Sequence, residues 1–138
     1  MSLDKAWQNS DEFYLYYKDP KFIINNPNVS AHMYIMLPCS DDECIVITLI
    51  TSSQKYKKLY DKKQLNCVIT LKSNELDFIN KDCVVDCNMA ELKEKLELIS
   101  SGAKAYKCKK IPQNLLNKIK QKIKQSPKVK RKVKKALL

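Results

Sequence analysis

Apolar residues gather in four short runs along the middle of the chain, and polar segments separate them. The runs cover residues 32–37, 44–51, 65–72 and 82–88. The run over 44–51 is rich in β-branched residues, which fit a pleated sheet, and no helix of crossover length is expected between the runs. Successive short strands of this kind favour an antiparallel sheet or small barrel over a parallel α/β fold.

The N-terminal segment carries the start and stop signals of a short helix. Asn9 or Ser10 can cap it, Glu12 stands three residues after Asn9 as in a capping box, and Pro20 ends it. These signals predict a helix over residues 10–18.

The hydrophobic period becomes helical after the last strand. An apolar repeat over residues 92–99 predicts one helix. Two basic amphipathic helices are then expected, one after Pro112 and one beginning at Ser126-Pro127. Their apolar stripes consist of Leu115, Leu116, Ile119 and Ile123 in the first helix and of Val129, Val133, Ala136 and Leu137 in the second.

The length of 138 residues fits a single α+β domain, with a lead-in at 1–28, a β core at 29–90 and a helical part at 91–138. No apolar run is long enough to span a membrane and no secretory leader is visible, so a cytoplasmic location is expected. The single glycine, Gly102, excludes glycine-rich phosphate loops. Six cysteines in apolar surroundings and one histidine predict buried, reduced thiols, with no metal and no cofactor.

The positive charge is concentrated at the C-terminus. Thirteen basic and no acidic residues follow from Lys107 onward, whereas residues 1–106 carry thirteen basic and fifteen acidic residues, a net charge of 13 − 15 = −2. Such a segment indicates an anionic partner, which can be nucleic acid, a membrane surface or an acidic protein. It can also be a solvated face that keeps the protein soluble. We expect the apolar stripes to pack in the core rather than on a membrane, which leaves the lysines facing outward.

The order of these elements resembles the PemK/MazF-like toxin superfamily over residues 29–138. The resemblance rests on a strand opening near His32, on "IVITLITSSQK", "NCVITL" and "DFINKDCVVDCNMAEL", and on the closing helical tail. It implies a small antiparallel SH3-like β-barrel with C-terminal helices and a homodimer. It further implies metal-independent cleavage of single-stranded RNA by a toxin whose partner is an antitoxin.

Candidate catalytic residues follow partly from this resemblance. Thr51 matches the threonine or serine that closes a strand in these toxins, and Ser52 is next to it. The arginine that the toxins carry before the preceding strand is absent, and His32 is the nearest polar residue. RNA cleavage needs a base, an acid and hydrogen-bond donors around the phosphate. His32 suits the proton transfers near neutral pH, while Thr51 and Ser52 can donate hydrogen bonds.

Candidate phosphate-binding residues lie after this strand and in the basic tail. They are Lys55, Lys57, Lys58, Lys118, Lys122, Lys130 and Arg131.

Three functions therefore stay open at the level of sequence. The chain can be an endoribonuclease toxin, a non-catalytic nucleic-acid-binding barrel, or an interaction module whose lysines dock an acidic protein such as an antitoxin. His32 can equally be a rim residue, and Thr51 an ordinary strand former.

Overall fold

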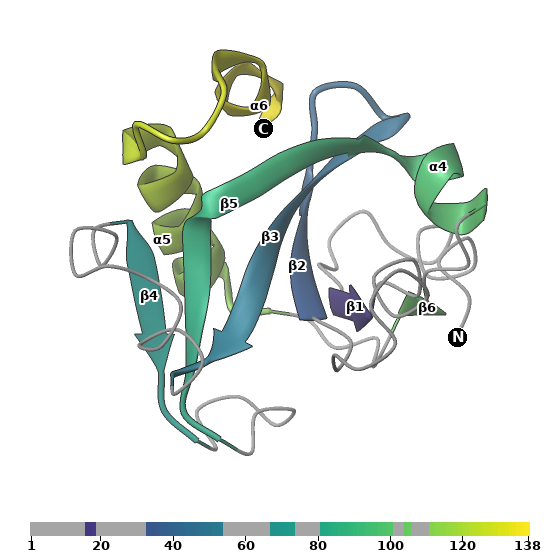
Figure 1. Cartoon of the computed structure of the whole chain (residues 1–138). Helices are drawn as coiled ribbons and strands as arrows, with labels where there is room; N and C mark the ends of the chain where they lie inside the picture. The colour runs from purple at the N-terminus through teal and green to yellow at the C-terminus, as the bar shows by residue number, and fades with distance from the viewer. Residues whose placement is uncertain (1–15, 19–32, 54–66, 74–80, 101–103, 106–110) are drawn as a thin grey trace.

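A computed structural model of the chain has an α+β architecture built on a curled antiparallel sheet (Figure 1). It describes residues 16–18, 33–53, 67–73, 81–100, 104–105 and 111–138. The strands are β1 (Tyr16–Lys18), β2 (Met33–Pro38), β3 (Cys44–Ser52), β4 (Val68–Leu71), β5 (Cys83–Glu94) and β6 (Lys104–Ala105). Their order in the sheet is β4-β5-β3-β2-β1-β6. The described strands confirm the antiparallel sheet, while closure into an SH3-like barrel stays a prediction.

The β2–β3 hairpin confirms the first two predicted strands. Pairing runs from Met33 opposite Ile50 to Pro38 opposite Ile45. The turn is held by Asp41, whose Oδ1 accepts a hydrogen bond of 2.9 Å from the backbone N–H of Glu43. Such a side-chain bond to the backbone two residues on is typical of aspartate in turns. The polar segment after Pro38 therefore acts as the turn that the sequence predicts.

Strand β5 is longer than the sequence predicts and is bent along its length (Figure 1). Its pairing with β3 is interrupted, because four residues of β5, 87–90, face the single residue Thr48 between two regular stretches. Such an excess of residues on one strand is a bulge, which bends the strand.

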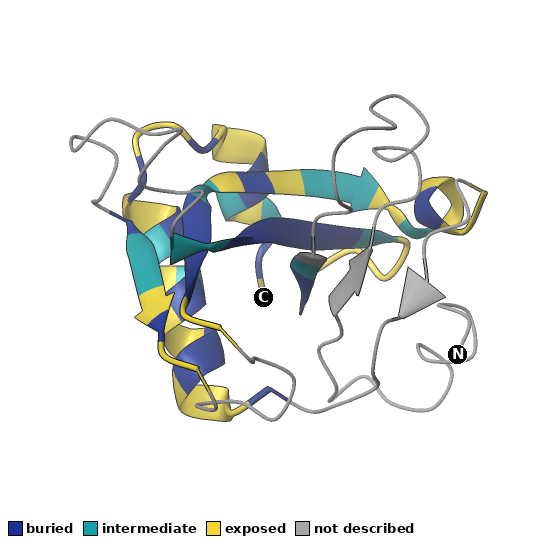
Figure 2. Ribbon diagram, turned by 60° about the horizontal axis from the view of Figure 1, so that its bottom comes forward, coloured by how far each residue is buried: buried dark blue, intermediate teal, exposed yellow. Residues whose placement is uncertain are grey.

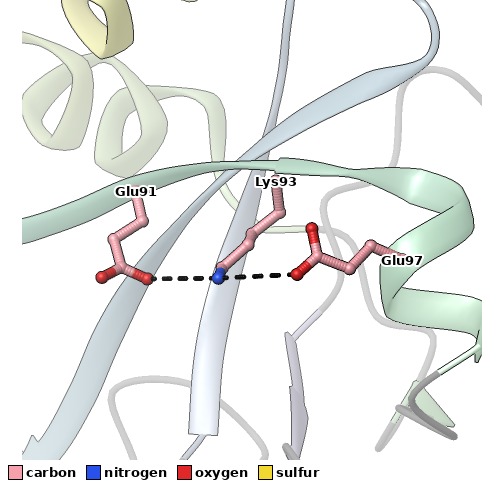
Figure 3. A network of polar contacts seen from close by, with 3 residues as sticks. All are labelled: Glu91, Lys93 and Glu97. Carbon is pink, nitrogen blue, oxygen red and sulfur yellow. Dashed lines mark ion pairs between the residues drawn. The ribbon is translucent and has the colours of Figure 1, made fainter.

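The helix predicted over residues 92–99 is wrong in its first part. Residues 91–94 continue β5 and pair with residues 44–47, and helix α4 (Lys95–Ser100) begins only afterwards. The backbone hydrogen bonds to β3 outweigh the helical spacing of the apolar residues, since tertiary context routinely overrides local propensity. Lys93, just before α4, lies between two carboxylates: its Nζ is 3.9 Å from Glu91 and 4.0 Å from Glu97 (Figure 3).

The predicted N-terminal helix is also wrong where the structure describes it. Tyr16–Lys18 form β1, which pairs with residues 33–35 of β2 and with β6. The edge of β2 offers unpaired backbone groups, and tyrosine is favoured in strands. The remainder of that prediction, residues 10–15, lies outside the described residues.

Two C-terminal helices, α5 (Gln113–Gln125) and α6 (Arg131–Ala136), pack against the sheet beside β5 (Figure 1). The end of the chain is tied to the turn that follows β2, because the backbone N–H of Ser40 donates to the carbonyl of Ala136 at 2.8 Å. In Figure 2 the helices alternate between buried and exposed segments, as expected when one face packs on the sheet. The core includes Ile35, Leu37, Val46, Val85, Leu116, Ile119, Ile123 and Val133. The predicted burial of the helical stripes is therefore confirmed, except that Ala136 is only half-buried.

Within the described residues, no helix combines the length and the apolar character needed to cross a membrane.

Candidate functional site

Helix α5 presents two chemically different faces. At 100° per residue, the buried Leu115, Leu116, Ile119 and Ile123 form one stripe facing the core. The opposite side carries a row of exposed amide side chains, with steps of three, four and four residues. This amide row consists of Asn114, Asn117, Gln121 and Gln125.

Lysines occupy both flanks of α5 between the core stripe and the amide row. Lys118 and Lys122 lie one helical turn apart on one flank, and Lys120 and Lys124 lie one turn apart on the other. Lys118 and Lys124 are exposed, whereas Lys120 and Lys122 are half-buried. Like charges at this spacing destabilise a helix by about 0.2–0.5 kcal/mol per pair. The helix thus carries two rows of positive charge despite their mutual repulsion.

The linker and α6 add further positive charge after α5. Residues 111–138 contain ten basic and no acidic residues. None of the ten forms an ion pair within the part of the chain that the structure describes. Uncompensated charge of one sign raises the local concentration of oppositely charged partners. We call these residues the cationic surface: Lys118, Lys120, Lys122, Lys124, Lys128, Lys130, Arg131, Lys132, Lys134 and Lys135.

A buried polar cluster holds the α5–α6 linker against the bulge of β5. The hydroxyl of Ser126 donates to Oδ1 of Asn88 at 2.5 Å and accepts the backbone N–H of Lys128 at 3.2 Å. Asn88 in turn donates to Oδ1 of Asp86 from both its backbone and its side-chain nitrogen, each at 3.1 Å. The bulge therefore fixes the linker residue that precedes the basic residues of α6. Ser126 ends α5, and Lys130 caps α6, so the predicted helix start at Ser126-Pro127 is wrong.

Asp86 is fully buried at the base of this cluster. Burial raises the pKa of its carboxyl group, and the hydrogen bonds from Asn88 and the charge of Lys128 oppose the shift in part. Its Oδ2 has no hydrogen-bond partner among the described residues. Its backbone carbonyl accepts the hydroxyl of Thr48 at 2.7 Å, which joins the cluster to β3. The cluster is thus a structural link between sheet and linker rather than an accessible acid.

Thr51 and Ser52, two of the three predicted catalytic residues, lie at the end of β3 away from α6. Thr51 is 6% exposed and pairs with Val84, and Ser52 is half-buried at the end of β3. At the opposite end of the hairpin, Cys39 forms a β-bridge with Leu137, the residue that follows α6. The nine residues of β3 span about 30 Å, and this length separates Ser52 from the end of the hairpin beside α6. His32 lies outside the described residues, so the catalytic set stays a prediction.

Of the predicted phosphate-binding residues, some lie outside the described part of the chain and the others lie on α5 and α6. Lys55, Lys57 and Lys58 lie outside the described residues. The structure places Lys118 and Lys122 on one flank of α5 and Lys130 and Arg131 at the start of α6, where three of the four are exposed and Lys122 is half-buried.

Sequence reasoning missed the second lysine row and the polar cluster. Lysine at every second position from 118 to 124 was a readable signal, because alternation on a helix places residues on two flanks. No such signal connects Asn88 with Ser126, which are 38 residues apart.

Four of the five described cysteines have buried thiols, whereas Cys44 is only half-buried. Cys39, Cys67, Cys83 and Cys87 are buried and free, which confirms buried thiols at these positions. Burial raises the pKa of Cys39 to about 11 and that of Cys87 to about 12. Because the thiolate is the reactive form, such thiols are inert near neutral pH.

Comparison with known proteins leaves the chain without an assigned family. No protein-family model matches the sequence, and a search of curated proteins finds no match. The PemK/MazF-like resemblance, the homodimer and the antitoxin partner therefore stay predictions.

Proposed function

We propose that this protein binds nucleic acid through the cationic surface of α5, the linker and α6. The observation that carries the proposal is a segment, residues 111–138, that holds ten basic and no acidic residues, with none of the ten in an ion pair among the described residues. Lysine neutralises phosphates and releases their counterions, which supplies most of the affinity of sequence-independent binding. With a single arginine in the chain, Arg131, bidentate contacts from guanidinium groups contribute little.

The packing of the helices favours nucleic acid over a membrane as the anionic partner. Interfacial helices insert an apolar face among lipids. On α5 that face is occupied, because Leu116, Ile119 and Ile123 are completely buried in the core. The cationic surface then offers charge and polar groups only, which suits a phosphate backbone.

We propose binding rather than RNA cleavage because the predicted catalytic residue Thr51 is buried. A hydroxyl that stabilises a scissile phosphate must reach it within hydrogen-bond distance. Thr51 is 6% exposed within β3. Cleavage of single-stranded RNA by His32, Thr51 and Ser52 can be read in the same experiment, by incubating the RNA with the protein in EDTA.

The test is a binding titration of the full chain against fluorescent single-stranded RNA, single-stranded DNA and duplex DNA at several salt concentrations. We expect log affinity to fall linearly with log salt, with a slope of about −0.7 to −0.9 per phosphate neutralised. The double variant Lys118→Gln/Lys122→Gln should lower the affinity. It should also make the slope shallower, by up to the contribution of about two phosphate contacts. Lys93→Gln is the matched control, because Lys93 already lies between two carboxylates.

Two outcomes would overturn the proposal. One is the absence of salt-dependent binding to any of the three nucleic acids. The other is tighter binding to poly-glutamate than to nucleic acid at equal charge, which would identify an acidic protein as the partner.

A further inference from the structure

We propose that α5 enters the major groove of duplex DNA, with its amide row at the base edges and its two lysine rows at the phosphates of the two strands. This inference rests on the proposed function and names its substrate class. It derives from the order of chemistry around α5, which is core stripe, lysine flank, amide row, second lysine flank.

The dimensions of α5 fit this groove. An α-helix with its side chains is about 10–12 Å across, and the major groove of B-form DNA is about 12 Å wide and admits such a helix. The thirteen residues of α5 are about 20 Å long, which corresponds to several base-pair steps. The amide row is exposed along this whole length, from Asn114 to Gln125.

The amide row supplies the groups that read base edges. Asparagine and glutamine amides can bond adenine N6 and N7 together, and this pairing identifies adenine in the major groove. Gln121 and Gln125 make no hydrogen bond with another described residue, so their amides are available. Asn117 already accepts a hydrogen bond from Gln113 at 3.0 Å, and Asn114 accepts the N–H of Leu115. Base reading is therefore assigned to Gln121 and Gln125.

The two lysine rows distinguish a duplex from a single strand. A single phosphate backbone can follow only one flank of a helix, whereas a groove has a backbone on each side. Lys118 and Lys124 border the amide row on opposite sides and are both exposed, as contacts to two backbones require. A-form RNA has a deep, narrow major groove that side chains cannot read, so duplex RNA does not provide the same fit.

The test compares four ligands of equal length with the full-length protein: an A·T-only DNA duplex, a G·C-only DNA duplex, a duplex RNA and a single-stranded RNA. We expect the A·T duplex to bind at least about fivefold tighter than the others, since one bidentate base contact discriminates by about 1–3 kcal/mol. The variant Gln121→Ala/Gln125→Ala should bind both DNA duplexes equally and keep the salt dependence of the parent. Replacing adenine by 7-deazaadenine, which lacks the N7 acceptor, should weaken parent binding and leave the variant unaffected.

The lysine variant Lys118→Gln/Lys124→Gln provides the contrasting readout. It should weaken binding to both DNA duplexes by the same factor and reduce the salt dependence, because phosphate contacts carry no sequence information. The inference is overturned if single-stranded or duplex RNA binds as tightly as the A·T duplex. It is also overturned if a preference for A·T survives the glutamine substitutions. In both cases salt-dependent binding still supports the proposed function, whereas no binding to any ligand defeats both.

Discussion

Strand β3 and helix α5 both carry polar residues among apolar ones, but the fold treats them differently. β3 lies between β2 and β5, and every residue from Ile45 to Thr51 is buried. Helix α5 covers the sheet and buries only one stripe. The hydroxyls of a central strand are therefore committed to the interior, as Thr48 is to the carbonyl of Asp86. The polar face of the outer helix stays exposed.

The largest effect should come from breaking the buried face of α5. Ile119 is completely buried, so Ile119→Ala removes core contacts and leaves a cavity, at a cost of about 2–5 kcal/mol in the free energy of unfolding. Denaturant unfolding monitored by circular dichroism measures this change. Leu96→Ala on α4, where the side chain is 75% exposed, is the control and should stay within about 0.5 kcal/mol. Equal losses in the two variants would contradict the packing of α5.

A smaller loss is expected from cutting the link between sheet and linker. Ser126→Ala removes the donor to Asn88 and the acceptor for the N–H of Lys128, at a cost of about 1–3 kcal/mol for the groups left unpaired. The exposed Ser100 gives a matched control, Ser100→Ala, measured by the same unfolding experiment. If both alanine variants unfold at the parent's midpoint, Ser126 does not anchor the linker.

The middle of the fold could be predicted from the sequence because its signals are local. Apolar runs bounded by turns located β2 and β3, and the helical spacing of Leu115 to Ile123 identified the buried stripe of α5. Continuation of β5 through Glu94 depends on pairing with Cys44, fifty residues away in the chain. No window around Glu94 contains that partner.

The same difference between local signals and long-range contacts limited the prediction of the candidate site. Charge is a local property, so the lysines of α5 and α6 could be identified from the sequence. The role of Ser126 could not, because its partner Asn88 lies on the bulge of β5. Thr51 was predicted to face a substrate because it matches the residue that closes a strand in the PemK/MazF-like toxins, but its low exposure depends on the neighbouring strands and on what covers the sheet.

The pH dependence of stability tests the buried end of the polar cluster. Because burial raises the pKa of Asp86, the folded state keeps this proton to a higher pH than the unfolded state, where an aspartate titrates near about 3.9. Its contribution to the free energy of unfolding is therefore present below that value and is lost as pH rises through the folded pKa. Asp86→Asn removes this titration.

The measurement is the difference in free energy of unfolding between the parent and Asp86→Asn, followed from acid to neutral pH. This difference, parent minus variant, should fall as pH rises and then level off. A difference that rises with pH would show that the carboxylate is stabilised in the folded state and that the cluster is more polar than the burial of Asp86 indicates.

The smallest effect should come from Lys93 on β5, whose ammonium group has two carboxylate partners. Its ammonium group lies 3.9 Å from Glu91 and 4.0 Å from Glu97, and all three side chains are partly exposed. Exposed ion pairs contribute about 0–1 kcal/mol, so Lys93→Gln should barely change the unfolding midpoint. Because its charge is already compensated, the same variant should retain the parent's affinity for nucleic acid, whereas Lys118→Gln should not. If both substitutions weaken binding equally, net charge alone governs the interaction and the arrangement of lysines on α5 has no special role.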